Sequence, residues 1–497
     1  MTTARGEQLR IVQGLRHATA SGMVIFLLTV LPPRKSQAEA GNDFKFMYYQ
    51  EDKSRIRVLA PTFSTQHETE NGWTIKLDGI YNAISGATPT GAPPKAVAPA
   101  PSVSAPRSSS SSAPAPAPVT VTAATPTGES EHEGGNDTRF SPSRSQTVTG
   151  LTVKPVKHIS AKPAASFAAV TGASQIVTPP PATPTTTAPA TTSTGGASGG
   201  SSGGGSTTAA TPAAPAPSSA SRIPLADFSD TRWAFNIGLS KHLGQHTPGG
   251  QFSFSQESDY QSVGLSLQDA IDFNRKNTTL SLGAAVTHDT LNPANGRPSA
   301  TKDSVDFMVG VTQVLTPVTL FTANLSIGEV SGFISDPYKV VELNGDITYE
   351  KRPDSKTKEI VYLGLEQFIT PLDASIELGL RHYQDSYGIT SETVTLAWFQ
   401  KLGSRWVLSP SMRYYTQTAA DFYDVRFSGS PEFYSSDYRV SALTGMSYGL
   451  KAIWTPTTRL TLDIGVDRYT QQGNDGKTDP EMYPASTVFI VGAHWAL

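Results

Sequence analysis

The sequence contains no cysteine, which excludes disulfide bonds, thiolate metal sites and thioether attachment of haem. A chain without thiols also suits a protein that passes unfolded through an oxidising compartment, where stray thiols would pair wrongly. Neither sign of charge is in excess, because 39 Lys and Arg stand against 42 Asp and Glu. This balance gives no reason to expect a nucleic-acid partner.

Long hydrophobic runs are also lacking. The apolar run at residues 23–31 has about nine residues and is followed by Pro32 and Pro33, whereas a membrane-spanning helix needs about 20. Arg5, Arg10 and Arg16 precede the run, and Ala38-Glu39-Ala40 is a small-x-small cleavage pattern. We therefore expect residues 1–40 to be a signal peptide that is removed near Ala40 during export.

Three zones follow the predicted signal. Residues 41–85 and 223–497 are rich in aromatic residues, whereas residues 86–222 consist mostly of Ala, Pro, Ser, Thr and Gly. Such a composition cannot bury enough apolar surface to offset its ordering entropy. We expect residues 86–222 to be a disordered insert in a single folded unit.

The two aromatic-rich zones alternate between apolar and polar residues again and again, which is typical of β-strands with one apolar face. In residues 460–467, for example, Leu460, Leu462, Ile464 and Val466 share one face. About 14 such segments are found, at residues 56–60, 73–81, 233–239, 263–267, 280–286, 305–311, 321–327, 361–365, 375–383, 394–398, 406–414, 440–454, 460–466 and 488–497. The sequence predicts an all-β fold, an antiparallel transmembrane β-barrel of about 14 strands.

The connections between these segments alternate in length. Counted from the C-terminus, short connections such as 402–404 and 370–373 alternate with long ones such as 419–436 and 331–357. Outer-membrane barrels have short periplasmic turns and long extracellular loops. The same count assigns the insert at 86–222 to the short-turn, periplasmic side.

A soluble sandwich also alternates, so two further features favour a membrane barrel. Aromatic residues near strand ends suit the headgroup level of a bilayer, and the chain ends on a strand that resembles the terminal signal of outer-membrane proteins. The predicted aromatic girdle consists of Trp233, Trp398, Trp406, Trp454 and Trp495.

The opposite face of the strands should line a water-filled lumen. By alternation, its charged residues are Arg55, Arg57, Lys76, Asp78, Asp306, Glu366, Glu377, Arg381, Arg413, Lys451, Asp463 and Asp467. A ring of one sign would predict ion selectivity. The two signs balance here, which predicts bracing ion pairs or a weakly selective path.

Five stretches stand out in the aromatic-rich zones: MYYQEDKSRIRV, WTIKLDGIYNAISGATPTG, NRKNTTLSLG, MRYYTQTAADFY and SSDYRVSALTGMSYGLKAIW. They resemble a family of uncharacterised bacterial outer-membrane proteins, catalogued as a domain of unknown function. The resemblance covers nearly all of the aromatic-rich zones, and the insert interrupts it. It implies export and a membrane β-barrel, and it supplies no catalytic residue and no substrate.

Other motifs have ordinary explanations beside functional ones. Asp259-Tyr260 and Asp336-Pro337-Tyr338-Lys339 are polar clusters on the loop side that could bind a ligand or cation, or simply form turns. The aromatic run from Tyr414 to Tyr438 is either loop packing or a stacking surface for flat ligands. His288, His382 and His494 lack the spacing of a helical zinc motif, and the Gly-x-Ser-x-Gly match at 196–200 lies in a Gly/Ser run.

We accordingly expect no catalytic residue, metal site or cofactor. The expected location is the outer membrane of a Gram-negative-type bacterium, with membrane lipid, lipopolysaccharide and the barrel-assembly machinery as partners. The first functional hypothesis is a porin-like channel or transporter for an unidentified small solute. The alternatives are a structural or secretion-related anchor, whose insert meets a periplasmic partner, and an enzyme with a site at the loop rim.

Overall fold

The computed structural model describes residues 40–92 and 223–496. The predicted signal peptide and residues 93–222 of the predicted insert lie outside the described residues. Short 3₁₀ turns, η1 (Asp52–Ser54), η3 (Asn274–Lys276), η4 (Thr370–Leu372), η5 (Tyr438–Val440) and η6 (Pro480–Met482), connect the strands. In these described ranges, no helix reaches the length and apolar character that crossing a bilayer requires.

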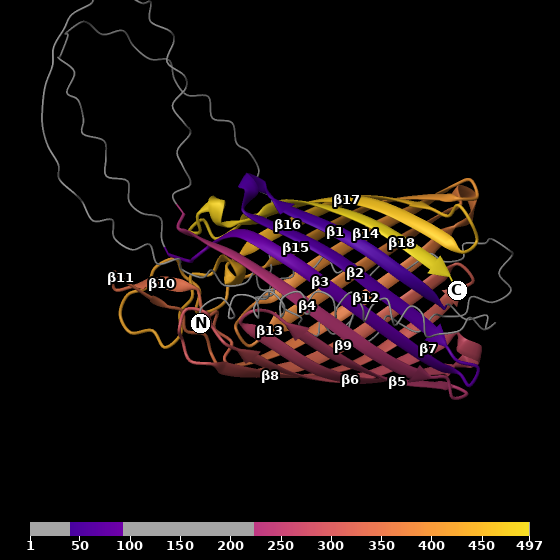
Figure 1. Ribbon diagram of the computed structural model, residues 1–497, viewed down its shortest axis with the longest axis horizontal. Coiled ribbons are helices and arrows are strands. Elements are labelled where there is room, and N and C mark those ends of the chain that lie inside the picture. The colour runs from indigo at the N-terminus through magenta and orange to yellow at the C-terminus, as the bar shows by residue number, and fades with distance from the viewer. Residues whose placement is uncertain (1–39, 93–222, 497) are drawn as a thin grey trace, which may run out of the picture.

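The described residues form a closed antiparallel barrel of 16 strands, together with a separate two-stranded hairpin (Figure 1). The strands are β1 (Gly41–Glu51), β2 (Ile56–Glu68), β3 (Trp73–Pro89), β4 (Leu225–Lys241), β5 (His246–Gln256), β6 (Tyr260–Phe273), β7 (Thr278–Leu291), β8 (Ala300–Thr316), β9 (Thr319–Gly332), β10 (Val340–Leu343), β11 (Asp346–Tyr349), β12 (Ser355–Ile369), β13 (Ala374–Asp385), β14 (Thr390–Leu402), β15 (Trp406–Gln417), β16 (Leu443–Trp454), β17 (Leu460–Gly473) and β18 (Ala485–Ala496).

Pairing between the first and last strands closes the barrel. β1 runs antiparallel to β18 from the pair Gly41–Ala496 to the pair Glu51–Ser486. Every other barrel strand pairs with its neighbour in sequence, and β12 pairs with β9 across the β10–β11 hairpin. The all-β barrel is therefore confirmed, and closure leaves no exposed sheet edge in the membrane.

The predicted count of about 14 strands is too low, because β1 and β5 were not recognised. In β1, the inward residues Met47 and Tyr49 join an apolar cluster, so both faces of the strand are apolar and the alternation disappears. In β5, the run Pro248-Gly249-Gly250 interrupts the pattern. Both strands were missed because their local composition departs from the alternation of apolar and polar residues.

The missed β5 has a topological consequence for the insert. The connection between β3 and β4 leaves at Pro89 and returns at Leu225, at the barrel end opposite Gly41 and Ala496 (Figure 1). The prediction that the insert lies on the short-turn side is therefore wrong, since one missing strand reverses the side of every earlier connection. β3 also continues to Pro89, beyond the predicted boundary at residue 85.

The outer face of the barrel is a continuous apolar surface. On β8, Val305, Phe307, Val309 and Val311 are exposed, while Asp306, between two of them, is buried. Their neighbours across β6, β7 and β9 are exposed as well: Leu265, Leu267, Leu282, Val286, Leu325 and Ile327. A soluble protein rarely exposes apolar patches beyond a few hundred Å², so this surface is the face that contacts lipid tails.

Most of the tryptophans on this face lie near the short-turn end of the barrel. Trp406 and Trp454 stack at 5.5 Å between ring centroids where β15 begins and β16 ends. Trp398 and Trp495 lie near the same ends of β14 and β18. Trp233 lies elsewhere: it pairs with Gln256, the last residue of β5, and so marks the opposite, loop-side limit of that strand.

We predict that Ile464→Arg destabilises the folded barrel by about 2–4 kcal/mol, the usual cost of a cation facing hydrocarbon near the bilayer midplane. Ile464 is 60% exposed on the outer face of β17. Urea unfolding in lipid vesicles, followed by tryptophan fluorescence, measures the change. Ile347→Arg is the matched control, because Ile347 is 56% exposed on the β10–β11 hairpin, outside the barrel wall. Equal effects of both substitutions would contradict a lipid-facing surface.

Candidate functional site

Most of the predicted lumen residues lie on the inward face of the barrel wall. In each strand they alternate with exposed apolar residues, as Asp463 and Asp467 do around Ile464 and Val466. The residues on this face are Lys76, Asp78, Asp306, Glu366, Glu377, Arg381, Arg413, Lys451, Asp463 and Asp467.

Two predicted lumen residues lie elsewhere. Arg57 is exposed on the outer face of β2, beside Leu59, and its guanidinium donates to Ser85 Oγ at 3.4 Å. The prediction failed for Arg57 because the apolar face of β2 points inward here: Ile56 is buried in a cluster at this end of the barrel, and Val58 packs against it. Arg55 is buried within the loop-side mouth, where it donates to the carbonyl oxygen of Glu481 at 2.8 Å.

Ion pairs brace the wall between adjacent strands, and in one case across an intervening strand, β9. Lys358 Nζ lies 2.9 Å from Asp306 Oδ1, and Lys302 Nζ lies 3.1 Å from Asp289 Oδ2. Gly328 makes room for the first pair, because a Cβ there would lie 2.1 Å from Asp306 Oδ1. Asp306 is one of the predicted lumen residues, whereas Lys358, Lys302 and Asp289 were not among them.

The loop between β9 and β12, residues 333–354, extends across the barrel mouth. Val340 N donates to Thr90 O at 3.0 Å, just beyond the end of β3. In the wall, however, the five strands from β4 to β8 lie between β3 and β9. Asn295 Nδ2, from the β7–β8 loop, donates to Pro337 O at 2.9 Å. The β9–β12 loop therefore connects parts of the barrel wall that are not in direct contact.

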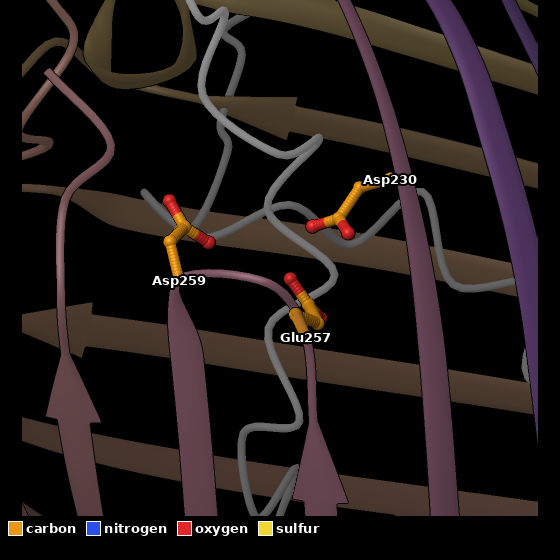
Figure 2. Close-up of side chains that lie close together, drawn as sticks. All are labelled: Asp230, Glu257 and Asp259. Carbon is orange, nitrogen blue, oxygen red and sulfur yellow. The ribbon is translucent and has the colours of Figure 1, made fainter. Parts of the chain in front are cut away.

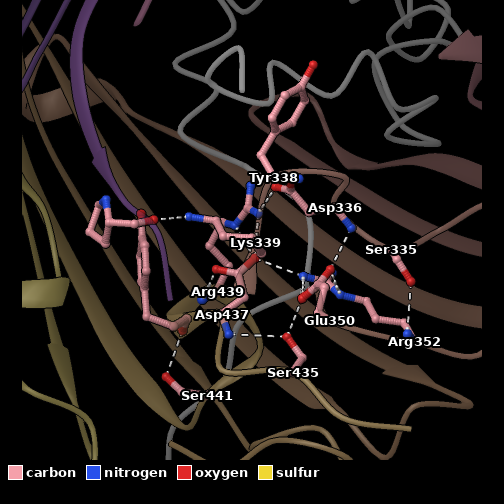
Figure 3. Close-up of polar contacts among 12 residues, drawn as sticks. Ser335, Asp336, Tyr338, Lys339, Glu350, Arg352, Ser435, Asp437, Arg439 and Ser441 are labelled. Atoms are coloured by element: carbon pink, nitrogen blue, oxygen red, sulfur yellow. Dashed lines mark hydrogen bonds and ion pairs between the residues drawn. The ribbon is translucent and has the colours of Figure 1, made fainter. Parts of the chain in front are cut away.

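A buried ionic network fixes this loop to the β15–β16 loop, residues 418–442 (Figure 3). Arg352 pairs with Glu350 at 2.8 Å and with Asp437 at 2.8 Å. Arg439 bonds to Asp437 through Nε at 2.6 Å and to Asp336 through Nη2 at 2.5 Å. Lys339 Nζ donates to Pro89 O, so the network also holds the end of β3.

Three acids and three bases make up this network, which we call the mouth network: Asp336, Glu350 and Asp437 with Lys339, Arg352 and Arg439. Burial alone would raise the pKa of Asp437, but Arg439, Lys339 and Arg352 together hold it well below its usual range. Burial lowers the pKa of Lys339 and raises that of Glu350. Since opposite charges are balanced and bonded, the network can remain ionised inside the loops.

Aromatic packing surrounds the mouth network. Tyr387 and Phe422 meet edge to face at 4.9 Å, and Tyr438 meets Tyr483 at 5.7 Å. Tyr415, Phe422 and Tyr438 are buried. These members of the aromatic run are therefore packed inside the loop-side mouth, which supports the packing interpretation over a stacking surface for flat ligands.

The three histidines considered in the sequence each pair with a carboxylate. Nδ1 of His288 lies 2.7 Å from Asp303, that of His382 lies 2.5 Å from Glu392, and that of His494 lies 3.0 Å from Asp43. His288 and His382 are cross-strand partners of these carboxylates, in positions that alternate with the inward face. Their pairing is explained by strand geometry.

The two polar motifs noted in the sequence meet at the mouth. Tyr338 Oη donates to Asp259 Oδ2 at 2.6 Å, which joins the β9–β12 loop to the turn between β5 and β6. The residues Glu350, Arg352, Asp437 and Arg439 were missed, because charged loop residues are ordinarily solvated and no spacing marks them. Lys356 and Lys358 were missed as well, although extending the alternation of β12 towards its start would have found them.

The model of a protein family described as "Protein of unknown function (DUF3570)" matches residues 26–304 and 299–492. No curated protein matches the sequence.

Three solved structures illustrate the structural similarity. A variant of the ferric enterobactin receptor PfeA from Pseudomonas aeruginosa is 10% identical with a TM-score of 0.37, over 92% of this chain and 60% of that one. CdiB from Acinetobacter baumannii is 7% identical with a TM-score of 0.42, over 93% and 61%. A bacterial polysaccharide outer membrane secretin is 8% identical with a TM-score of 0.40, over 93% and 100%. The chain thus spans about 60% of the length of the receptor and of CdiB.

We predict that Arg352→Ala loosens the β9–β12 loop while leaving the barrel folded. Removing one partner of a buried ion pair costs about 3–5 kcal/mol, since the remaining charges stay buried and uncompensated. Hydrogen exchange read by mass spectrometry should show faster exchange in residues 333–354 and 418–442, with unchanged protection in β7 and β8. Arg426→Ala is the control in the same loops, because the Arg426–Glu342 pair is exposed and such pairs contribute about 0–1 kcal/mol. Unchanged loop protection in Arg352→Ala would contradict the assigned role of the mouth network.

Proposed function

This chain belongs to the DUF3570 family, and on that premise we propose that it is an outer-membrane channel or transporter for a small polar solute, closed at its loop-side mouth by interlocked loops. The observation that carries the proposal is the contrast between the barrel and its mouth. The wall of 16 strands has a polar, charged inner face, while the β9–β12 and β15–β16 loops join across one end.

The size of the barrel supports passage of a solute. Barrels of about 16 strands enclose an aqueous channel, whereas barrels of about eight are filled by their own side chains. At the other end of the barrel, the connections between the described strands from β6 onward are all short turns. They are residues 274–277, 317–318, 370–373, 403–405 and 455–459. Turns of this length cannot reach across a barrel of this width, so closure is the task of the long loops.

The chemistry of the wall supports a small polar or weakly charged solute. Inward cations and anions alternate along the wall, as Lys76 and Asp78 do at 3.4 Å and Lys358 and Asp306 do at 2.9 Å. A balanced wall attracts neither sign of ion strongly. We therefore propose selection by size at the mouth rather than by charge in the lumen.

A second candidate function is display of the segment between β3 and β4 on the loop side. The two ends of this segment are held together, since Thr90 N donates to Pro224 O at 3.1 Å. Long loops of outer-membrane barrels are extracellular, so such an anchor would present its segment outside the cell rather than to a periplasmic partner. Deleting residues 95–220 separates the candidates, because a transporter should keep its solute flux after the deletion.

We predict that breaking the mouth network opens the channel. In planar bilayers, the refolded protein should show small and infrequent conductance steps, and the double variant Asp437→Asn, Arg439→Ala should show steps that are several times larger or longer. Liposome swelling with neutral sugars of increasing size gives the cutoff. Arg426→Ala, which alters an exposed pair in the same loop, should behave as the unmodified protein. Absence of conductance and swelling in the folded double variant would contradict the proposed channel.

A further inference from the structure

Three carboxylates converge at the mouth, apart from the mouth network. Asp230 lies on β4, and Glu257 and Asp259 flank Ser258 in the turn between β5 and β6 (Figure 2). One oxygen from each lies within 4.8 Å of those of the other two. All three are buried, since Asp230 and Asp259 are each 8% exposed and Glu257 is 5% exposed.

One oxygen of this group has no partner, which is unusual for a buried carboxylate. Asp259 Oδ2 accepts a hydrogen bond from Tyr338, but Asp259 Oδ1 is buried without any hydrogen bond. Leaving a buried acceptor unsatisfied costs about 1–3 kcal/mol, and more for a charged group. The orphan oxygen is therefore free to accept a ligand that supplies positive charge.

The neighbouring residues do not neutralise the three acids. Arg232 Nε lies 3.6 Å from Glu257 Oε1 and donates to Ser255 Oγ at 2.8 Å. Ser258 Oγ donates to Asp230 Oδ2 at 2.9 Å. One cation against three carboxylates leaves a formal charge of about −2 when all are ionised, which is the charge that one divalent cation offsets.

We propose that Asp230, Glu257 and Asp259 form a binding site for a divalent cation, with Ca²⁺ as the preferred ion. The donors are all oxygens, which suits Ca²⁺ or Mg²⁺ rather than Zn²⁺. Ca²⁺ binds oxygens at about 2.3–2.6 Å, so two ligands of the same ion lie up to about 5 Å apart, and its flexible geometry tolerates an irregular cluster better than the strict octahedron of Mg²⁺. The spacing of up to 4.8 Å meets this limit.

The site also joins the mouth to the wall. Tyr338 belongs to the β9–β12 loop and contacts Asp259 directly, and Ala294 N donates to Tyr338 Oη at 2.6 Å. A cation held by Asp259 fixes the oxygen to which Tyr338 donates. Binding should therefore steady the β9–β12 loop, and this expectation does not depend on which solute, if any, the barrel conducts.

The test is Ca²⁺ titration of the full chain, refolded without lipopolysaccharide and treated with chelator, by calorimetry at mildly alkaline pH, where carboxylate ligands are deprotonated. We expect about one saturable site per chain, with affinity reduced tenfold or more in Glu257→Gln and in Asp259→Asn because each removes one ligand charge. Tyrosine-sensitised Tb³⁺ emission, displaced by Ca²⁺, provides a second readout near Tyr338. Heat-modifiable gel migration establishes that each variant is folded.

Asp303→Asn is the matched control, because Asp303 is an acid at the same end of the barrel that pairs with exposed His288. It should bind Ca²⁺ as the unmodified protein does. Absence of saturable binding in the unmodified protein, or equal affinity in Glu257→Gln, Asp259→Asn and the control, would overturn the site. Conductance of the unmodified chain is measured separately, so failure of the cation site and failure of the channel are distinguishable.

Discussion

The structure depends on one constraint, which is the alternation of side chains in a wall that closes on itself. Pairing of β1 with β18 satisfies every edge, and closure forces one face of each strand outward and the other inward. In a bilayer, the outward face must be apolar, since an arginine or lysine facing the midplane costs about 2–4 kcal/mol. Ile464 and Val466 alternate with Asp463 and Asp467 on β17 for this reason. A slip of one residue in register would exchange the two faces.

The same constraint explains why the loops carry the distinctive chemistry. The sequence of the wall has little freedom to vary, because each inward side chain must fit beside its neighbours. Asp467, for example, lies over Gly449, where an added Cβ would lie 2.1 Å from Asp467 Oδ1. The loops have no such repeat and can form a compact layer with its own buried charges. Buried ion pairs give little net stability over apolar packing, but they demand one geometry. The mouth network therefore specifies how the loops meet, and the three carboxylates beside it add a second fixed point between loop and wall.

The sequence predicted the wall better than the mouth. Alternation is a local signal, so it identified the strands around Leu462 and Phe307 and the inward position of Asp306. It failed where local composition departs from the pattern, at Met47 and Tyr49 in β1 and at Pro248 in β5. The missed β5 then moved the insert to the wrong end.

The mouth depends on contacts between residues far apart in the chain. Asp259 and Tyr338 were both noted as polar, but nothing in their spacing indicates that they form a hydrogen bond. Arg352 and Asp437 lie in different loops, and their pairing requires the barrel to close first. Such contacts follow from the fold, and no periodicity in the sequence encodes them.

The most direct test of the account uses the absence of cysteine, since any introduced thiol is the only one in the chain. Ile464→Cys should carry a fluorophore that a lipid-borne quencher reaches from the bilayer. Gly465 is the next residue along β17, and an added Cβ there has its nearest atom at 3.8 Å, so a side chain fits. A fluorophore on Gly465→Cys should not be reached by that quencher, and the thiol should react with a water-soluble reagent. Equal quenching at the two positions would contradict a wall with lipid on one side and water on the other.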